Sequence, residues 1–304
     1  MKKIIFCLFC LFFITSSFCR QRTLYVDNFN NIIGSPSKED KLLLFAKKNN
    51  FKTLILYQLN KVNKRWPLTD PQKNNVLAAF MSKAKSEFGI QSIGASGESA
   101  SFFTKTINLY NNSRNKSIEK FDIYNLEYEY WSNKASGEDG YYCVNYLQEN
   151  AISCNREGSF NYFIANLKEI KKLSKKNKNT VQIEAYLGYY TENELIEISK
   201  YCDRLLIQAH GKTPQLSFNA AKKSLQYIAK INSKIKTSVL FSTKMTHLGY
   251  WLKFDNLKNG ESMFFDEMNA KNIELRKHLN LDGFSYHAYT DLERSMSYYA
   301  YSKN

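Results

Sequence analysis

Acidic side chains alternate along one short segment of the chain, and their types and spacing could support acid–base chemistry. The segment from Asp122 to Trp131 reads Asp-Ile-Tyr-Asn-Leu-Glu-Tyr-Glu-Tyr-Trp. Successive side chains of a strand point to opposite faces, so Asn125, Glu127 and Glu129 would share one face. The Cβ atoms of the two glutamates would then lie roughly 6–7 Å apart, because a strand rises about 3.3 Å per residue.

Two carboxyl groups this close repel each other when ionised, and a partly desolvated interior adds to the cost, so the pKa of one of them should rise. One protonated and one ionised carboxyl near neutral pH is the arrangement that acid-catalysed cleavage of glycosidic bonds requires. The pair would titrate as a coupled unit, so the spacing alone does not assign the proton. If the strand lay at a sheet edge instead, both glutamates would face water.

The elements that must position this segment follow a regular order. Runs rich in β-branched and aromatic residues alternate with amphipathic, lysine-rich stretches such as 74–88, 160–176, 192–201 and 219–231. Such alternation predicts parallel strands connected by helices. The predicted strands are 23–27, 52–58, 90–95, 121–129, 181–187, 204–209, 236–242 and 283–288.

Eight β–α repeats in 304 residues predict an α/β protein with a single-domain (β/α)8 fold, a TIM barrel. A doubly wound open sheet is the alternative, but no Gly-rich phosphate loop follows the first predicted strand. The connections 130–159 and 243–262, after strands four and seven, are long. In a barrel, loops that follow strands lie on the catalytic face.

Two motifs on neighbouring predicted strands resemble signatures of glycoside hydrolase family 18, the chitinases and endo-β-N-acetylglucosaminidases. The fourth-strand segment reads D-x-x-N-x-E-x-E and is followed by Tyr, where the family usually has D-x-x-D-x-D-x-E. Ser92-Ile-Gly-Ala95 on the third strand resembles the family motif S-x-G-G. The resemblance implies a barrel that hydrolyses β-linked N-acetylglucosamine-containing glycans with retention, the substrate's own acetamido oxygen attacking the anomeric carbon.

The resemblance also implies roles for individual residues. Glu129 takes the position of the general acid, and Glu127 that of the carboxylate that orients the acetamido group. Asn125 stands where the family has a buried aspartate, and Asp122 matches a position that is more structural than catalytic. Glu127 is one methylene longer than the usual aspartate, which matters because catalytic positioning tolerates only small displacements.

Other candidate substrate-binding residues lie at the ends of later strands. Gln208 and His210 share a face of strand six, where the family often has a Tyr-Asp pair, and one of them could donate a hydrogen bond to the reacting group. His287 ends strand eight, where the family usually has a tryptophan beneath the sugar. Tyr186 on strand five and Trp131 after strand four could contact the sugar, or could pack in the core instead.

The N-terminus predicts export. Lys2 and Lys3 precede an apolar run over 4–14, followed by Thr15-Ser-Ser, which is the order of a secretory signal peptide. The run is too short to span a bilayer, which needs roughly 20 residues; a short membrane anchor is the alternative. We therefore expect a signal peptide over 1–19, a barrel domain over 20–304, no membrane span in the mature chain, and a secreted or periplasmic location.

Export permits disulfides. Cys143 and Cys154 flank a Tyr-rich segment that a disulfide could close into a loop. Cys202 opens an apolar run and is expected to be a small buried thiol. Beyond the expected signal peptide, the sequence has no CxxC pair and no histidine cluster, so we expect neither a metal nor a cofactor.

Charge and composition limit the kinds of partner that the protein is expected to bind. The chain has 43 Lys+Arg against 28 Asp+Glu, a formal charge of +15, and 43% hydrophobic residues. The hydrophobic content excludes a disordered chain. The charge could attract anionic polymers, but the lysines are spread along helical stretches, which argues against nucleic-acid binding. We expect a monomer whose partner is an N-acetylglucosamine-containing glycan.

Three functions remain open at this point. The first is an exported hydrolase with Glu129 as its acid. The second is a non-catalytic, lectin-like barrel that keeps the cleft without the chemistry, and the departures at Glu127, His210 and His287 favour it. The third is a basic surface protein that binds anionic polymers away from the barrel mouth.

Overall fold

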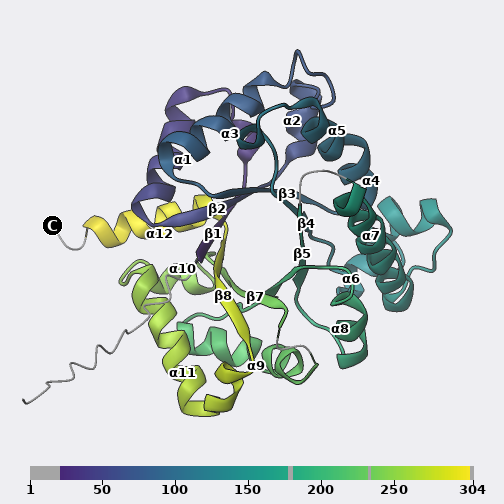
Figure 1. The fold of residues 1–304 in the computed structure, drawn as a ribbon. Coiled ribbons are helices and arrows are strands. Elements are labelled where there is room, and N and C mark those ends of the chain that lie inside the picture. The colour runs from purple at the N-terminus through teal and green to yellow at the C-terminus, as the bar shows by residue number, and fades with distance from the viewer. Residues whose placement is uncertain (1–20, 177–180, 232–233, 302–304) are drawn as a thin grey trace, which may run out of the picture.

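Eight parallel strands form a closed barrel in which each strand pairs with its neighbours in the sequence and β8 pairs with β1. The structure, a computed structural model, describes residues 21–176, 181–231 and 234–301; the expected signal peptide over 1–19 lies outside them. Figure 1 looks along the barrel axis and shows the helices arranged around the outside. The predicted single-domain (β/α)8 fold is confirmed.

The strands occupy nearly the predicted positions. They are β1 Gln21–Val26, β2 Phe51–Leu56, β3 Ser92–Gly97, β4 Ile123–Leu126, β5 Gln182–Leu187, β6 Arg204–Gln208, β7 Lys236–Ser242 and β8 Asn280–His287. The main helices are α1 Pro36–Lys48, α3 Asn75–Phe88, α7 Arg156–Lys176, α8 Glu192–Ile198, α9 Pro214–Ile231, α11 Leu257–Lys277 and α12 Tyr289–Tyr301. Shorter helices lie in the connections: α2 Leu59–Arg65, α4 Ala100–Phe102, α5 Asn108–Ser113, α6 Asn133–Ser136 and α10 Leu248–Trp251.

The core has two layers, which follow from the alternation of side chains along each strand. Leu126, Tyr128 and Tyr130 are fully buried between the barrel and its helices, as predicted for the outward face of the fourth strand segment. A smaller apolar cluster fills the inside of the barrel. Its buried members are Tyr25, Ile55, Ile123, Tyr186, Leu206 and Leu240.

β4 is shorter than predicted, and this corrects the predicted range 121–129. The strand ends at Leu126, although the Glu127 N–H still donates to Gly97 O at 2.9 Å. Three residues later the Tyr130 N–H donates to Tyr128 O at 2.9 Å, so the backbone has turned on itself. Glu127 and Glu129 therefore lie just beyond the carboxyl end of the strand.

A buried ion network lies inside the barrel below this level. The Arg204 guanidinium donates to Glu184 Oε1 at 2.7 Å, and its Nε lies 3.0 Å from a carboxylate oxygen of Asp282. Glu184 is 0% exposed and Arg204 is 3% exposed. A buried carboxylate needs such a partner, because desolvation otherwise makes its charge very costly. The network joins β5, β6 and β8.

The loops after β4 and β7 are long, as predicted. A disulfide between Cys143 and Cys154 closes part of the first loop, with 11 residues of sequence separation. Cys202 is a buried free thiol, also as predicted. Within the part of the chain that the structure describes, no helix is both long and apolar enough to cross a membrane.

Candidate active site

Glu127 and Glu129 face a cavity of about 120 Å³ at the mouth of the barrel. The carboxyl ends of all eight parallel strands meet at this end, where barrel enzymes place their catalytic groups. The cavity contains five of the residues predicted to form a site, together with five others. Its lining residues are Tyr25, Glu127, Glu129, Tyr186, His210, Leu240, Ser242, Lys244, His247 and His287.

A second cavity, of about 310 Å³, adjoins the first because Glu127 lines both. Its other walls come from the ends of β2 and β3 and from the disulfide-closed loop. They include Tyr57, Gln58, Asn60, Ser96, Glu98, Phe102, Tyr141 and Tyr146. The hydroxyls of Tyr141 and Tyr146 both donate to Glu98 Oε2, at 2.8 and 2.6 Å. The two cavities together offer a path for an elongated ligand across the acidic pair.

The environment of the two glutamates favours their protonated forms. Burial, and then the charge of Glu129, raise the pKa of Glu127 to about 8. Burial also raises the pKa of Glu129, while the positive charge of Lys244 acts in the opposite direction. The Ser96 hydroxyl donates to Glu127 Oε2 at 3.3 Å. The raised pKa favours the protonated form of Glu127 at neutral pH, and Ser96 holds its carboxyl group in place from β3.

A chain of hydrogen bonds crosses from β5 to β6. The Tyr186 hydroxyl donates to Gln208 Oε1 at 3.1 Å, which leaves the Gln208 amide nitrogen 2.8 Å from His210 Nδ1. An amide nitrogen only donates, so Nδ1 must accept and the neutral ring carries its proton on Nε2. Nε2 is buried and has no partner within the described residues. His210, whose side chain lines the cavity, thus has an N–H donor without an acceptor among the described residues.

Two further histidines complete this wall. His247 Nδ1 lies 2.8 Å from Ser242 Oγ, and the His247 ring stacks on His210 at 5.1 Å between centroids. His287 contacts the rings of Tyr25 and Tyr57, each at 5.5 Å. Burial first, then the other two histidines and Lys244, lower the pKa of His210 to about 4. Burial also lowers the pKa of His247 and of His287.

Asn125 lies beneath the mouth and does not line either cavity. Its amide nitrogen donates to the Tyr25 hydroxyl at 3.1 Å and to Glu184 Oε2 at 3.2 Å. Its side-chain oxygen is buried without a partner among the described residues. An amide cannot share a carboxylic proton as an aspartate would. Asn125 therefore connects the mouth to the buried ion network.

Two residues lie differently from what the motifs suggested, and a third lies as expected. Trp131 lines neither cavity; its ring packs edge-on against Tyr186 at 5.4 Å. Ser92 lies at the start of β3, and the serine that touches Glu127 is Ser96, four residues further along. Asp122 accepts the Ile93 N–H at 2.8 Å, so it holds β4 to β3, as expected of a structural position.

Sequence reasoning did not select Tyr25, Ser96 or Lys244. Tyr25 and Ser96 have the inward parity of their strands, and Lys244 follows the end of β7 by two residues. A closed barrel brings all such positions to one opening. That rule could have found them, but it selects many residues at once and does not rank them.

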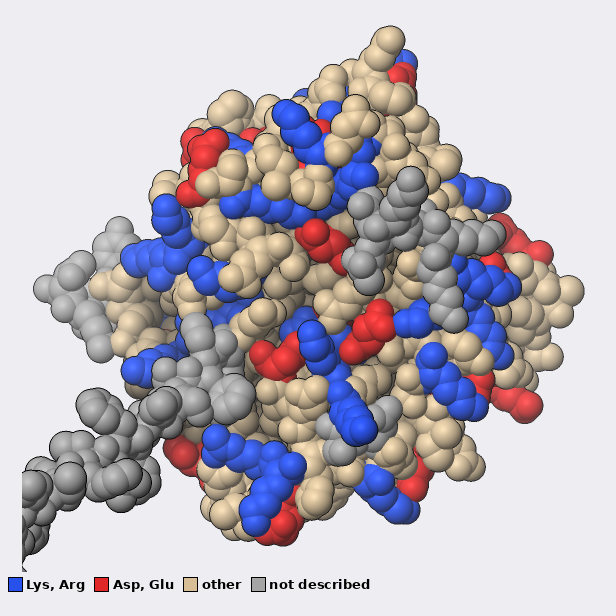
Figure 2. Space-filling view, viewed as in Figure 1, with Lys and Arg blue, Asp and Glu red and all other residues tan. Residues whose placement is uncertain are grey.

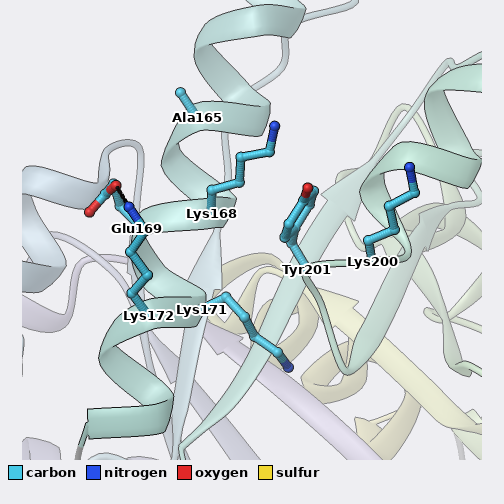
Figure 3. Close-up of a pocket in the computed structure, with 7 residues that line it drawn as sticks. All are labelled: Ala165, Lys168, Glu169, Lys171, Lys172, Lys200 and Tyr201. Atoms are coloured by element: carbon cyan, nitrogen blue, oxygen red, sulfur yellow. Dashed lines mark hydrogen bonds and ion pairs between the residues drawn. The ribbon is translucent and has the colours of Figure 1, made fainter.

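A different cavity lies on the outer wall of the barrel, between α7 and the end of α8. It measures about 500 Å³, and Figure 3 shows lysine side chains around it together with Tyr201. Each of these lysines has an acidic partner within 4 Å. The pairs are Lys168–Glu197, Lys171–Asp203, Lys172–Glu169 and Lys200–Glu197. These ion pairs make the outer-wall cavity a poor anion site. On the face seen along the barrel axis, basic side chains are likewise interspersed with acidic ones (Figure 2).

Among the described residues, no group of three or more His, Cys, Asp or Glu side chains is arranged to hold a metal ion. The histidines of the mouth are instead engaged with Gln208, Ser242 and aromatic rings.

Comparison with known proteins finds similarity in fold but no match in sequence. The sequence matches no family profile and no curated protein. Its structure is similar to the ICChI chitinase from Ipomoea carnea, with 13% identity, a TM-score of 0.50, and coverage of 91% of this chain and 98% of that one. A family 18 chitinase from Crocus vernus has 13% identity and a TM-score of 0.48, with coverage of 93% of this chain and 97% of that one. A 2,3-dimethylmalate lyase has 8% identity and a TM-score of 0.46, with coverage of 93% of this chain and 81% of that one. At 13% identity, the similarity to the Ipomoea carnea chitinase shows the fold alone, which is a TIM barrel.

Proposed function

We propose that this chain is an exported glycoside hydrolase that cleaves β-linked N-acetylglucosamine-containing glycans, with Glu129 as general acid and Glu127 as the group that orients the acetamido substituent. One observation carries the proposal. Two carboxyl groups at the end of β4 face one cavity at the barrel mouth, and burial raises the pKa of both. The choice of sugar rests on the D-x-x-N-x-E-x-E motif.

In the proposed mechanism, protonated Glu129 donates its proton to the glycosidic oxygen as the bond from that oxygen to the anomeric carbon breaks. The acetamido oxygen forms the new bond to the anomeric carbon, so no protein nucleophile is needed. Water then attacks the same carbon as its bond to the acetamido oxygen breaks, which restores the acetamido group, and Glu129, now ionised, accepts the proton of the water. Glu127, held by the Ser96 hydroxyl, orients the acetamido group by accepting a hydrogen bond from its N–H.

The direct test is release of reducing ends from chitooligosaccharides and N-glycans by the wild type and by Glu129→Gln. Loss of a general acid should lower kcat by about 10²–10⁴-fold. Glu138→Gln is a matched control, because Glu138 is an exposed glutamate in the same loop, and it should cleave at the wild-type rate. Equal rates for wild type and Glu129→Gln would contradict the proposal.

A lectin-like barrel is the second candidate, and one observation favours it. His287, where the family usually has tryptophan, is wedged between Tyr25 and Tyr57 and offers a small ring in place of a broad stacking surface. Binding of chitooligosaccharides by the wild type without any release of reducing ends would select this function. The Tyr186→Phe variant should then weaken binding, because it breaks the hydrogen bond to Gln208.

Export is part of the proposal. The Cys143–Cys154 disulfide supports it, since such bonds persist mainly in oxidising compartments. Expression of the full chain in a bacterial host should yield a mature protein in the periplasm or medium that begins near residue 20. Intact-mass measurement of each cell fraction tests this, and recovery of uncleaved protein in the cytoplasm alone would contradict it.

A further inference from the structure

The smaller cavity has two chemically different walls. Glu127 and Glu129 form the wall that follows β4, whereas Lys244 and the three histidines come from the ends of β6, β7 and β8. The acidic wall has the groups that the proposed cleavage needs. The opposite wall carries the side-chain nitrogen atoms of Lys244 and the histidines, and the proposed cleavage of a neutral glycan gives no role to a lysine there.

Lys244 is the lysine on that wall. Its side chain is exposed, and no carboxylate among the described residues lies within ion-pair distance of it. The lysines around the outer-wall cavity all pair with acidic neighbours, whereas Lys244 lines a cavity without such a partner in the part of the chain that the structure describes. A cation left unpaired at the edge of a small cavity is available to a ligand.

His210 adds a directed donor beside it. Because Gln208 fixes the ring tautomer, the buried Nε2–H of His210 has no protein acceptor among the described residues. Burying a donor without an acceptor costs free energy, which a ligand oxygen would recover. The cavity, about 120 Å³, has room for roughly four water molecules at about 30 Å³ each, enough for one small polar substituent.

We propose that the preferred glycan carries an oxyanion, a carboxylate or a sulfate, which binds between Lys244 and the Nε2–H of His210. This inference rests on the proposed function and narrows its substrate class. The anion would sit across the cavity from Glu129, with the lysine as its counter-ion and the histidine as a neutral donor. Lysine and a neutral histidine N–H can both bind either a carboxylate or a sulfate. The site therefore predicts a negatively charged substituent, and the experiment below distinguishes the two kinds.

The competing role for Lys244 is to act on Glu129 alone, since its charge already opposes the rise in the pKa of that carboxyl. The two roles predict different effects of Lys244 on acidic and neutral glycans. A lysine that only tunes Glu129 should affect cleavage of every glycan equally. A lysine that binds the substrate should affect acidic glycans and spare neutral ones.

The test is equilibrium binding to the Glu129→Gln protein, which prevents turnover. Three probes of equal length are compared by calorimetry: a neutral chitooligosaccharide, an oligosaccharide alternating N-acetylglucosamine with glucuronate, and a sulfated chitooligosaccharide. We expect at least one acidic probe to bind about tenfold more tightly than the neutral one in dilute buffer, and this advantage to shrink with added salt. The acidic probe that binds more tightly than the neutral one identifies the kind of oxyanion.

Adding Lys244→Met should remove the advantage of the acidic probe and leave binding of the neutral one within about twofold. Lys236→Met is the matched control, because Lys236 is exposed at the opposite end of the same strand, β7. This variant should change neither the binding of the acidic probe nor that of the neutral one. Equal binding of all three probes would overturn the inference while leaving the proposed function intact. So would a Lys244→Met variant that shifts the pH profile of cleavage equally for every glycan. Absence of both binding and cleavage for all probes would overturn the two proposals together.

Discussion

Glu127 is a carboxyl group that the folded protein holds in its protonated form near neutral pH. Its pKa rises from an ordinary value of 4.5 to about 8 through burial and the charge of Glu129. Folding therefore favours the bound proton, and the stability linked to it is complete below the unfolded pKa. That stability is lost as the pH rises from about 4.5 through about 8.

The thermal unfolding temperature of the wild type should consequently fall between pH 5 and pH 8, by about a few degrees for each kcal/mol lost. Glu127→Gln carries no titrating proton and keeps the shape of the side chain, so its unfolding temperature should fall less over the same range. Scanning calorimetry of both proteins across this interval measures the difference. Parallel pH dependences would mean that Glu127 is solvated and ionises normally.

At the scale of elements, the loop after β4 supports the backbone of Glu129, the proposed catalytic acid. The Glu129 backbone N–H donates to the Tyr142 hydroxyl at 3.0 Å, and the Tyr142 ring stacks on Tyr128 at 4.0 Å. Cys143, the next residue, is joined to Cys154. The disulfide therefore limits the movement of a residue that holds the backbone of Glu129.

The double variant Cys143→Ser, Cys154→Ser should lower the free energy of unfolding by about 2–4 kcal/mol, the usual range for a disulfide. It should also lower kcat for glycan cleavage more than it raises KM, because it loosens the acid and leaves the histidine wall in place. Urea unfolding and initial rates measure the two effects. A reducing agent should reproduce both in the wild type and change neither in the variant; unchanged kcat would show that Glu129 is held without the loop.

The elements were largely predictable from the sequence, and their ends were less so. Alternation along 121–129 identified which side chains face the barrel interior, because side-chain direction follows the backbone whether or not a neighbouring strand is paired. It could not locate the end of β4 at Leu126, where the backbone turns and Tyr130 bonds to Tyr128. Where a strand ends depends on its hydrogen-bonded neighbours, which periodicity does not report.

At the scale of the molecule, barrel closure decides the composition of the candidate site. Glu129, His210 and His287 were proposed from separate strands, and the closed barrel brings them to one cavity. The same closure adds Lys244, which no motif marks, and excludes Trp131, which packs against Tyr186 instead. Local sequence pattern reports the direction of a side chain, whereas contacts across the barrel depend on which loops pack together.

The buried ion network offers a test of how the barrel interior supports its mouth. Arg204→Met would leave Glu184 fully buried without its cationic partner. Removing one member of a buried pair typically costs about 3–5 kcal/mol, so urea unfolding should show a loss of that size. Changing Glu184 to Met as well should recover part of it, because the uncompensated charge is gone. If the double variant were as unstable as Arg204→Met, packing around the arginine, and not charge compensation, would hold β5, β6 and β8 together.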